Sequence, residues 1–475
     1  MKPELKFLSK KELLYIHNVA LDLLEDMGIE LLLEEARDIL KEGGAKVEGN
    51  IVKIPRELVA KAIKTAPKRD EFVLYGRNEE NDIRINESAP VLAAMTMATQ
   101  VIDLETREKR PATDEDLVHL TRVCEKLENV SIASALVTPQ DVPQRACDWY
   151  TWATSIKNTT KHITGGAVGK EGVRDAIRMA SLAVGSEEAF LERPFISFWV
   201  LTMPPMKIDN LTLEVLIEAS RYKVPSIISS GGILGLTSPI TIESALAHTH
   251  AEILACIALS QIINPGTPVV YTSFVRSMDM RTSNVSMSSP EFAIMKSCMG
   301  ELGRFLNLPT RMPAMLRDAK VLDAQAGFET GMVGTIGAMA SDIIEGMQFD
   351  MDMVVDYADL PYCNECMAQI KRVMRGVDIT DSRLALDVLF EIGHGGNFLS
   401  HTHTVSNFRK EIFMPKLAER GMWGDWEKSG SLDIKDKSLK LVRKMVEESK
   451  DMELLDEETQ KKIDQIAYEA SLKYK

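Results

Sequence analysis

A short apolar run in the C-terminal half of the chain ends abruptly in charge. The segment Pro313–Gly331 reads PAMLRDAKVLDAQAGFETG, so Met315 and Leu316 are followed directly by Arg317 and Asp318. In a parallel α/β fold, the carboxyl end of a buried strand is where ligands bind, and the strand body is packed inside. We therefore predict that Met315, Leu316 and Arg317 line a cavity and form the candidate catalytic position.

Other predicted strand ends carry aromatic and mildly polar residues. Trp199, Tyr271 and Phe274 lie at or near such ends, as do Arg276 and Gln348. Three aromatic rings could surround a quaternary ammonium group, where cation–π attraction contributes about 2 kcal/mol or more once water is excluded. We predict that all five contact the substrate. The alternative, that the rings only pack beneath loops, is equally compatible with the sequence.

Potential metal ligands occur in pairs. His401 and His403 are two residues apart in SHTHTV, and Cys363 and Cys366 have the spacing of half a zinc site. Four ligands at a standard spacing are not found, so we expect no tightly bound metal. A zinc-dependent barrel hydrolase that uses His401, His403 and an acid stays open as an alternative.

The order of predicted elements indicates a TIM (β/α)₈ barrel. From residue 112, strand-like and helix-like segments alternate about every 30 to 45 residues, as parallel βα units do. About seven strands are evident, and the eighth is the weakest assignment. The predicted organisation is an N-terminal helical and small-sheet extension (1–111), the barrel (112–410) and C-terminal helices (411–475). An open doubly wound sheet is the alternative, but the Gly-rich dinucleotide fingerprint is absent.

Composition limits the possible partners. The chain has 475 residues and a net charge of −14, which argues against a nucleic-acid binder and favours a cationic ligand. The N-terminal segment is charged and has no signal-peptide core, and no run reaches the ~18 apolar residues of a membrane span. The six cysteines are scattered. We expect a cytoplasmic protein without a membrane partner.

Several segments, in this order, resemble the trimethylamine methyltransferase family. They read TIESALAHTHAEILA, QIINPGTPVVYTSF, MRTSNVSMSSPE, LRDAKVLDAQAGFET and GHGGNFLSHTHTVSNFR, and the resemblance extends over about residues 10 to 430. It implies a TIM barrel that transfers a methyl group from a methylated amine to the cobalt of a separate corrinoid (cobalamin) protein. None of the eight histidines lies in an Asp-x-His-x-x-Gly context. The corrinoid is therefore expected on a cognate partner protein, and a homo-oligomer is expected as well.

The resemblance also bears on the substrate. Archaeal trimethylamine enzymes of the family carry pyrrolysine just before a segment like RDAK, where this chain has Leu316, or Met315 in the next best alignment. The branch without pyrrolysine implies a quaternary amine such as glycine betaine, proline betaine or carnitine. A quaternary nitrogen departs as a neutral tertiary amine, so it needs no further activation.

A betaine also carries a carboxylate, which needs a cation at the mouth of the barrel. Arg276, Arg281, Arg317 and His394 are the candidates. A non-catalytic betaine-binding protein is the remaining alternative.

Overall fold

The computed structural model describes residues 3–85, 89–95 and 97–474, and it is built around eight parallel strands. Their order in the sheet is β10-β11-β13-β14-β17-β18-β6-β9, and a bridge between Ile132 and His162 joins its two edges. This confirms the predicted TIM barrel. The strands are β6 (Val91–Ala94), β9 (Val130–Ala133), β10 (Ile163–Gly165), β11 (Ile196–Leu201), β13 (Ser226–Ser229), β14 (Val269–Thr272), β17 (Thr310–Leu316) and β18 (Ile343–Gln348).

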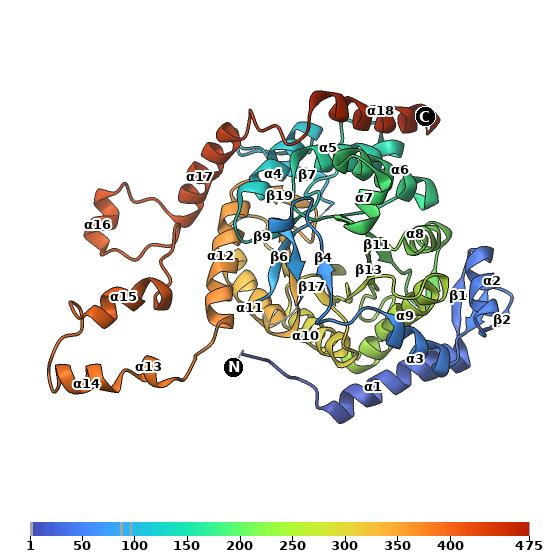
Figure 1. The fold of residues 1–475 in the computed structure, drawn as a ribbon, viewed down its shortest axis with the longest axis horizontal. Helices are drawn as coiled ribbons and strands as arrows, with labels where there is room; N and C mark the ends of the chain where they lie inside the picture. Colours follow the sequence, from blue (N-terminus) through green and yellow to red (C-terminus); the bar gives the residue numbers. More distant parts are fainter. Residues whose placement is uncertain (1–2, 86–88, 96, 475) are drawn as a thin grey trace.

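Helices surround this barrel (Figure 1). They are α4 (Asp114–Lys126), α5 (Cys147–Asn158), α6 (Gly169–Val184), α7 (Glu187–Glu192), α8 (Asn210–Arg221), α9 (Ile242–Ile263), α10 (Pro290–Phe305), α11 (Ala324–Ala340) and α12 (Asp359–Met374). Helix α9 alone among the described helices is long and apolar enough to span a membrane, and 89% of its most apolar stretch is buried inside the protein. It therefore has the character of a core helix.

The barrel begins earlier and ends earlier than the sequence predicted. Its first strand, β6, lies inside the segment 1–111 that was assigned to the N-terminal extension. This strand has four residues and an Ala-rich pattern, so it gave little periodic signal. The last barrel helix, α12, ends at Met374 rather than near residue 410.

A mixed layer of helices and strands precedes the barrel. Ser9 and Glu12 form a capping box that starts α1, and α1 and α3 then pack against α9. The layer comprises α1 (Lys10–Asp22), η1 (Leu23–Met27), β1 (Ile29–Leu31), α2 (Glu34–Glu42), β2 (Lys46–Glu48), β3 (Ile51–Lys53) and α3 (Arg56–Thr65), and β12 (Lys207–Ile208) extends its sheet.

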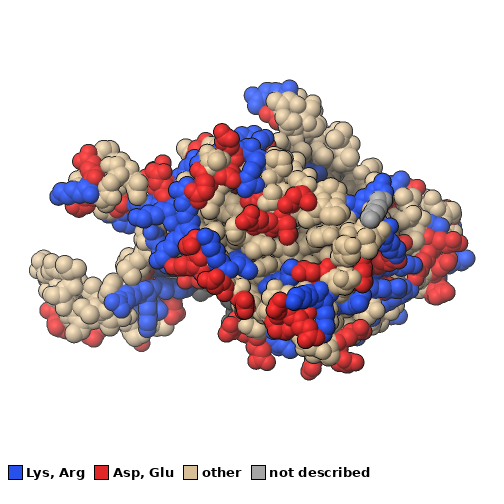
Figure 2. Space-filling view, turned by 90° about the horizontal axis from the view of Figure 1, so that it is seen from above, with Lys and Arg blue, Asp and Glu red and all other residues tan. Residues whose placement is uncertain are grey.

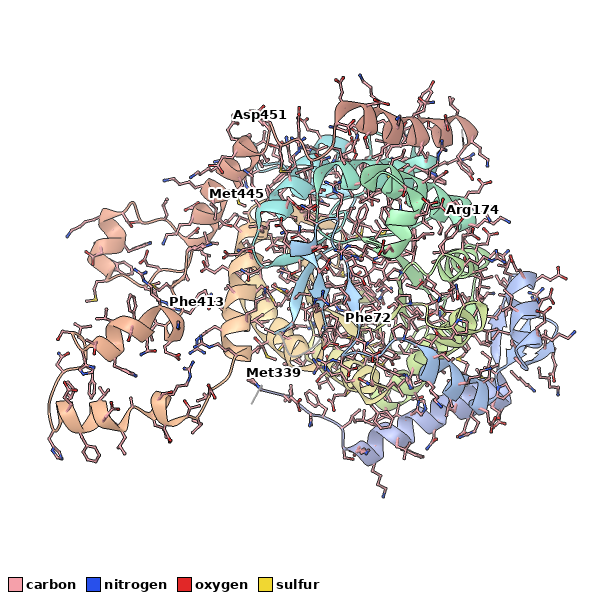
Figure 3. All side chains as sticks on the ribbon, in the orientation of Figure 1. Phe72, Arg174, Met339, Phe413, Met445 and Asp451 are labelled. Atoms are coloured by element: carbon pink, nitrogen blue, oxygen red, sulfur yellow. The ribbon has the colours of Figure 1, made fainter. Side chains whose placement is uncertain are left out.

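A small hairpin closes the N-terminal end of the barrel. Strands β4 (Val73–Leu74) and β5 (Ile83–Arg84) flank the short helix η2 (Glu79–Asn81). Phe72, just before β4, is buried with Ile343 and Val91 at the starts of their strands, and it lies near the barrel centre in Figure 3. Apolar side chains therefore fill the interior at the amino ends of the strands, and the carboxyl ends are the expected side for a ligand.

Further short elements frame that open end. They are the three-stranded sheet of β19 (Val354–Asp356), β7 (Gln100–Ile102) and β8 (Lys109–Pro111), the hairpin of β15 (Ser277–Asp279) and β16 (Asn284–Ser286), and the short helix η3 (Gln144–Ala146).

The C-terminal region is helical, as predicted, but it divides into two parts. Helix α17 (Ile434–Glu448) packs on α12 and α4, and α18 (Glu457–Lys473) packs on α5 and α6. Residues 377–432, here called the arm, carry α13 (Asp381–Leu384), α14 (Leu386–Ile392), α15 (Thr402–Glu411) and α16 (Trp423–Lys428) and project from the body (Figure 1).

Candidate active site

A buried ion pair occupies the barrel interior. Arg311 on β17 alternates with the outward-facing Thr310 and Met312, so its side chain points inward. Its Nε lies 2.5 Å from Glu345 Oε2 on β18, and its Nη1 donates to Thr164 Oγ1 at 2.8 Å. Burial lowers the pKa of Arg311, and the carboxylate of Glu345 opposes that shift. Sequence reasoning missed this pair, because the pattern TRMPAML was interpreted as a plain buried strand.

Unpartnered polar atoms occur on three strands of the barrel. Ser229 Oγ, Thr272 Oγ1, Glu345 Oε1 and Gln348 Oε1 are buried and have no hydrogen-bond partner within the described part of the chain. All four residues lie in the strands β13, β14 and β18, three of them at the last position. Buried polar groups are nearly always satisfied in native proteins. The open end of the barrel thus offers hydrogen-bonding capacity to a ligand or water, and Gln348, predicted to contact the substrate, lies at the last position of β18.

Trp199 and Phe274 lie together at this end. Their rings meet edge to face, 5.7 Å between centroids. The guanidinium of Arg311 stacks over the Trp199 ring at 4.7 Å, and the indole N–H points to the sulfur of Met95. One face of Trp199 is therefore already covered by a cation of the protein itself.

Arg276, which follows β14 at the open end of the barrel, has a hydrogen-bond donor that the described residues leave free. Its Nε has no hydrogen-bond partner among the residues described. Burial lowers the pKa of Arg276, and the nearby Asp352 opposes that shift. Arg281, by contrast, is fully exposed and paired with Asp279 at 2.8 Å.

Tyr271 does not belong to the site, and the prediction that it lines the mouth is wrong. Its neighbour Val270 packs into the barrel interior, so alternation along β14 turns Tyr271 outward. The hydroxyl group of Tyr271 lies 2.7 Å from His250 Nδ1 on α9, and His250 in turn contacts His17. The side chain is completely buried.

Arg317 and Met315 are also turned away from the cavity. The guanidinium of Arg317 forms a bidentate ion pair with Asp359 at the start of α12 and stacks on Phe349. Burial alone would lower the pKa of Arg317, but the Asp359 carboxylate outweighs it and raises the pKa. Met315 packs against Gly334 on α11. Neither is placed to act on a substrate.

An irregularity in β17 explains this outcome. The register against β18 shifts between Pro313 and Met315 and again between Met315 and Leu316, which breaks the simple alternation of side chains. Leu316 is 1% exposed and packs in an apolar cluster. A strand-end pattern alone could not reveal such a shift.

The remaining candidate residues lie in the arm or in α12, outside the barrel interior. His394 is exposed in the arm, which projects from the body, so it does not lie in the barrel of its own chain. His401 caps α15 and lies 3.4 Å from Glu391. Cys363 and Cys366 lie within α12, where burial raises the pKa of both thiols. Within the described ranges, no group of three or more metal-ligating side chains comes together.

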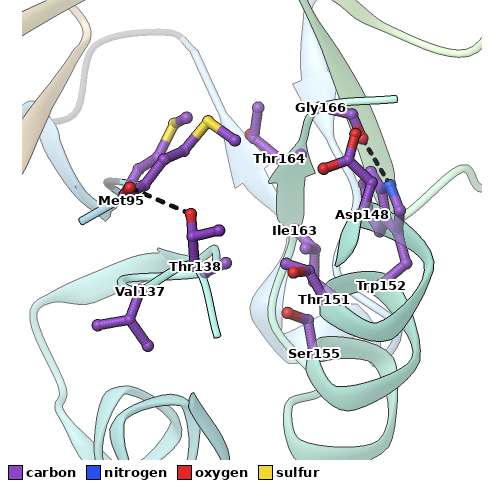
Figure 4. Close-up of a pocket in the computed structure, with 13 residues that line it drawn as sticks. Met95, Val137, Thr138, Asp148, Thr151, Trp152, Ser155, Ile163, Thr164 and Gly166 are labelled. Atoms are coloured by element: carbon purple, nitrogen blue, oxygen red, sulfur yellow. Dashed lines mark hydrogen bonds between the residues drawn. The ribbon is translucent and has the colours of Figure 1, made fainter. Parts of the chain in front are cut away.

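A narrow pocket adjoins the site on the side of β6, β9 and β10 (Figure 4). Its walls carry Met95 and Met97, which follow β6, and Asp148 and Trp152 on α5. The indole N–H of Trp152 donates to the carbonyl of Gly166 at 2.8 Å. Sequence reasoning missed these residues, although one face of the helix CDWYTWATSIKN mixes an acid, hydroxyls and a Trp beside a strand end.

A second buried carboxylate fixes the loops at the mouth. Glu252 on α9 accepts hydrogen bonds from Thr202 Oγ1, from Ser230 Oγ at 2.8 Å and from the backbone N–H of Met206 at 2.6 Å. These groups follow β11 and β13. Glu252 therefore stabilises the loop conformation rather than offering a free charge.

Comparison with known proteins agrees with this architecture. The chain is 33% identical over 430 residues to the trimethylamine methyltransferase MttB of Desulfitobacterium hafniense, covering 90% of this chain and 86% of that protein. It is 31% identical over 435 residues to a glycine betaine methyltransferase of the same species, covering 90% and 89%. The monomethylamine methyltransferase of Methanosarcina barkeri shares the fold, with a TM-score of 0.54 at 14% identity over 92% of this chain and 93% of that one.

The family model described as trimethylamine methyltransferase (MTTB) matches residues 1–470. Together with the relatives above 30% identity, this match confirms the resemblance seen in the sequence. The protein is a methyltransferase and belongs to the trimethylamine methyltransferase family.

Proposed function

We propose that the protein transfers a methyl group from a quaternary amine of the betaine type to the cobalt of a separate corrinoid protein. The observation that carries this proposal is the aliphatic Leu316 at the end of β17, where the family resemblance implies pyrrolysine in trimethylamine enzymes. The similarity to a glycine betaine methyltransferase supports it, although a trimethylamine relative is equally similar.

The reaction requires little acid–base chemistry. The C–N bond breaks as the methyl carbon bonds to cobalt, and its electron pair leaves with nitrogen as a neutral tertiary amine. The protein then has to bind, orient and desolvate the substrate. Trp199, Phe274, Gln348 and Arg276 are proposed to contribute to this, with Arg276 as the counter-cation for a substrate carboxylate.

We expect trimethylamine to be the poorer substrate. With free cob(I)alamin as acceptor, kcat/KM for at least one quaternary amine should exceed that for trimethylamine by about tenfold or more, or about 1.4 kcal/mol in barrier height. Glycine betaine, proline betaine, carnitine, γ-butyrobetaine and trimethylamine are compared, and formation of methyl-Co(III) is followed by absorbance. Equal or faster turnover of trimethylamine would contradict the proposal.

The corrinoid partner is proposed to dock over the open end of the barrel. Exposed apolar side chains surround that end, which is unusual for a solvated rim and fits a docking surface. They are Met97, Leu201, Met203, Leu236, Ile240, Met280 and Met353. Docking there would bring the cobalt close to the site while the corrinoid stays bound to the partner protein.

The arm supports the proposal of a homo-oligomer. Figure 2 shows it as two lobes that stand away from the body. Its exposed apolar residues include Val377, Ile379, Leu384, Leu386, Leu389, Phe390, Phe398, Leu399, Val405, Phe408, Ile412, Met414, Met422 and Trp423. Permanent interfaces between copies are more apolar than those of partners that bind and leave. A second copy of this chain therefore suits the arm better than the corrinoid protein, which must dissociate after each transfer.

The double variant Phe390→Asp/Leu399→Asp should reduce the oligomer. Phe390 is 78% and Leu399 79% exposed, so the changes cost the monomer little, but two carboxylates would have to be desolvated in an interface. Light scattering coupled to size exclusion measures the mass. Tyr15→Asp, at a residue 71% exposed on α1, is the control. An unchanged mass for the double variant would refute the role of the arm.

A further inference from the structure

The pocket beside α5 opens where the barrel wall is weakest. Strands β9 and β10 are joined by one isolated bridge, between Ile132 and His162, where the other neighbouring barrel strands form ladders of two or more residue pairs. Met95 and Thr164 form the inner end of the pocket, and both contact Arg311 in the barrel interior. The pocket is therefore an outward branch of the candidate active site.

One face of α5 forms the outer wall. Asp148, Thr151, Trp152 and Ser155 are spaced i, i+3, i+4 and i+7, which places them along one side of a helix. Figure 4 shows Asp148, Thr151 and Ser155 facing Val137 and Thr138 across the pocket. Apart from Thr138 and Thr164, the rest of the wall carries apolar side chains or glycine, and no lysine or arginine is among the residues that line the pocket.

Asp148 is the single charged group of this pocket. Its carboxylate has no hydrogen-bond or ion-pair partner within the described residues, and burial raises the pKa of Asp148. Ser155 Oγ, deeper in the pocket, is buried and also unpartnered. Gly166 leaves space beside the acid: a Cβ there would lie 3.8 Å from Asp148 Oδ2 and 3.9 Å from Met97 Cε.

We propose that this pocket binds the methylated ammonium group of the substrate, with Asp148 as its counter-ion. Met95, Met97 and Trp152 then contact the methyl groups, because polarisable sulfur and aromatic surfaces suit a large, weakly hydrated cation. A half-buried, unpaired carboxylate repels anions and attracts a cation by its charge, which a neutral ligand does not offer. The inference rests on the proposed function for the identity of the amine, but cation binding can be measured without methyl transfer.

The aromatic cage predicted from the sequence is replaced by this pocket. Tyr271 faces outward, and one face of Trp199 is covered by Arg311. A second cation on that face would be repelled by the guanidinium at short range. In the pocket beside α5, by contrast, the substrate cation would lie next to the carboxylate of Asp148.

The test is calorimetric titration of the intact protein with tetramethylammonium chloride. The variant Asp148→Asn keeps the size of the side chain and removes the charge, so its affinity should fall about tenfold or more. The variant Asp148→Glu retains the charge and should recover part of the affinity. Asp141→Asn, a change at an exposed acid in the preceding loop, should bind like the wild type. Binding of the neutral analogue 3,3-dimethylbutanol should be the same in all variants.

Two outcomes would overturn the assignment. One is wild-type affinity for tetramethylammonium in Asp148→Asn, and the other is no measurable binding by the wild type. A separate measurement distinguishes this from failure of the proposed function. If Asp148→Asn keeps the wild-type KM in methyl transfer from a quaternary amine, the pocket assignment fails and the function stands. If no amine donates a methyl group to cob(I)alamin, the function fails, while the titration still decides the pocket.

Discussion

Replacing Arg317 with Met is expected to lower the free energy of unfolding by about 3–5 kcal/mol, the usual loss when one partner of a buried ion pair is removed. Arg317 and Asp359 are both fully buried, and their contact ties the end of β17 to the start of α12. Without the guanidinium, the Asp359 carboxylate is left charged in an apolar environment. Urea unfolding followed by circular dichroism measures the change.

A surface pair provides the matched control for Arg317. Arg281 forms a similar bidentate contact with Asp279, but its side chain is fully exposed. Exposed ion pairs contribute little because water screens them. Arg281→Met should therefore leave the urea midpoint unchanged. If Arg317→Met were equally stable but inactive, Arg317 would be a functional residue after all, as the sequence had suggested.

The architecture could be predicted because it depends on periodicity. Alternating helix and strand patterns from residue 112 gave seven of the eight barrel strands, and the family resemblance agreed with them. The strand β6 was misplaced, since four residues with small side chains carry almost no pattern. The predicted barrel extended to residue 410 and so included part of the arm, whereas the last barrel strand, β18, ends at Gln348 and α12 ends at Met374.

The site was harder to predict than the fold. Locating the strand ends was sufficient to find Trp199, Phe274, Arg276 and Gln348 near the open end, yet it could not decide which way each side chain points. Tyr271 was misjudged because inward and outward positions alternate residue by residue.

A search limited to the carboxyl ends of predicted strands also could not find site residues that lie elsewhere. Arg311 is the second residue of its strand, and Asp148 lies on a helix that follows a loop. Both were missed because only strand ends were searched. An acid with hydroxyls and a Trp on one helix face is the signal that could have found Asp148.

Removing Arg311 should lower the free energy of unfolding as much as removing Arg317 does. In the Arg311 variant, however, this loss should depend on pH. In Arg311→Met, the carboxylate of Glu345 stays in the barrel interior without its partner, and we expect a loss of about 3–5 kcal/mol at neutral pH. Changing both residues, to Met and Gln, removes both charges of this pair and should recover most of the lost stability. A double-mutant cycle in urea gives the coupling between them.

The direction of the pH effect follows from Glu345. Burial raises its pKa above the ordinary carboxyl value, and removing Arg311 takes away the main group that opposes this shift, so that the more weakly acting charge of Lys296 is left. The folded state then binds the proton more tightly than the unfolded state. The stability of Arg311→Met should therefore rise as pH falls from the raised pKa toward the ordinary one.

Between these two pH values, the stability of the wild type and of the double variant should change less. The wild type keeps its ion pair, and the double variant has no acid at position 345. A pH-independent loss in Arg311→Met would mean that Arg311 stabilises the barrel by packing on Trp199 rather than by its charge.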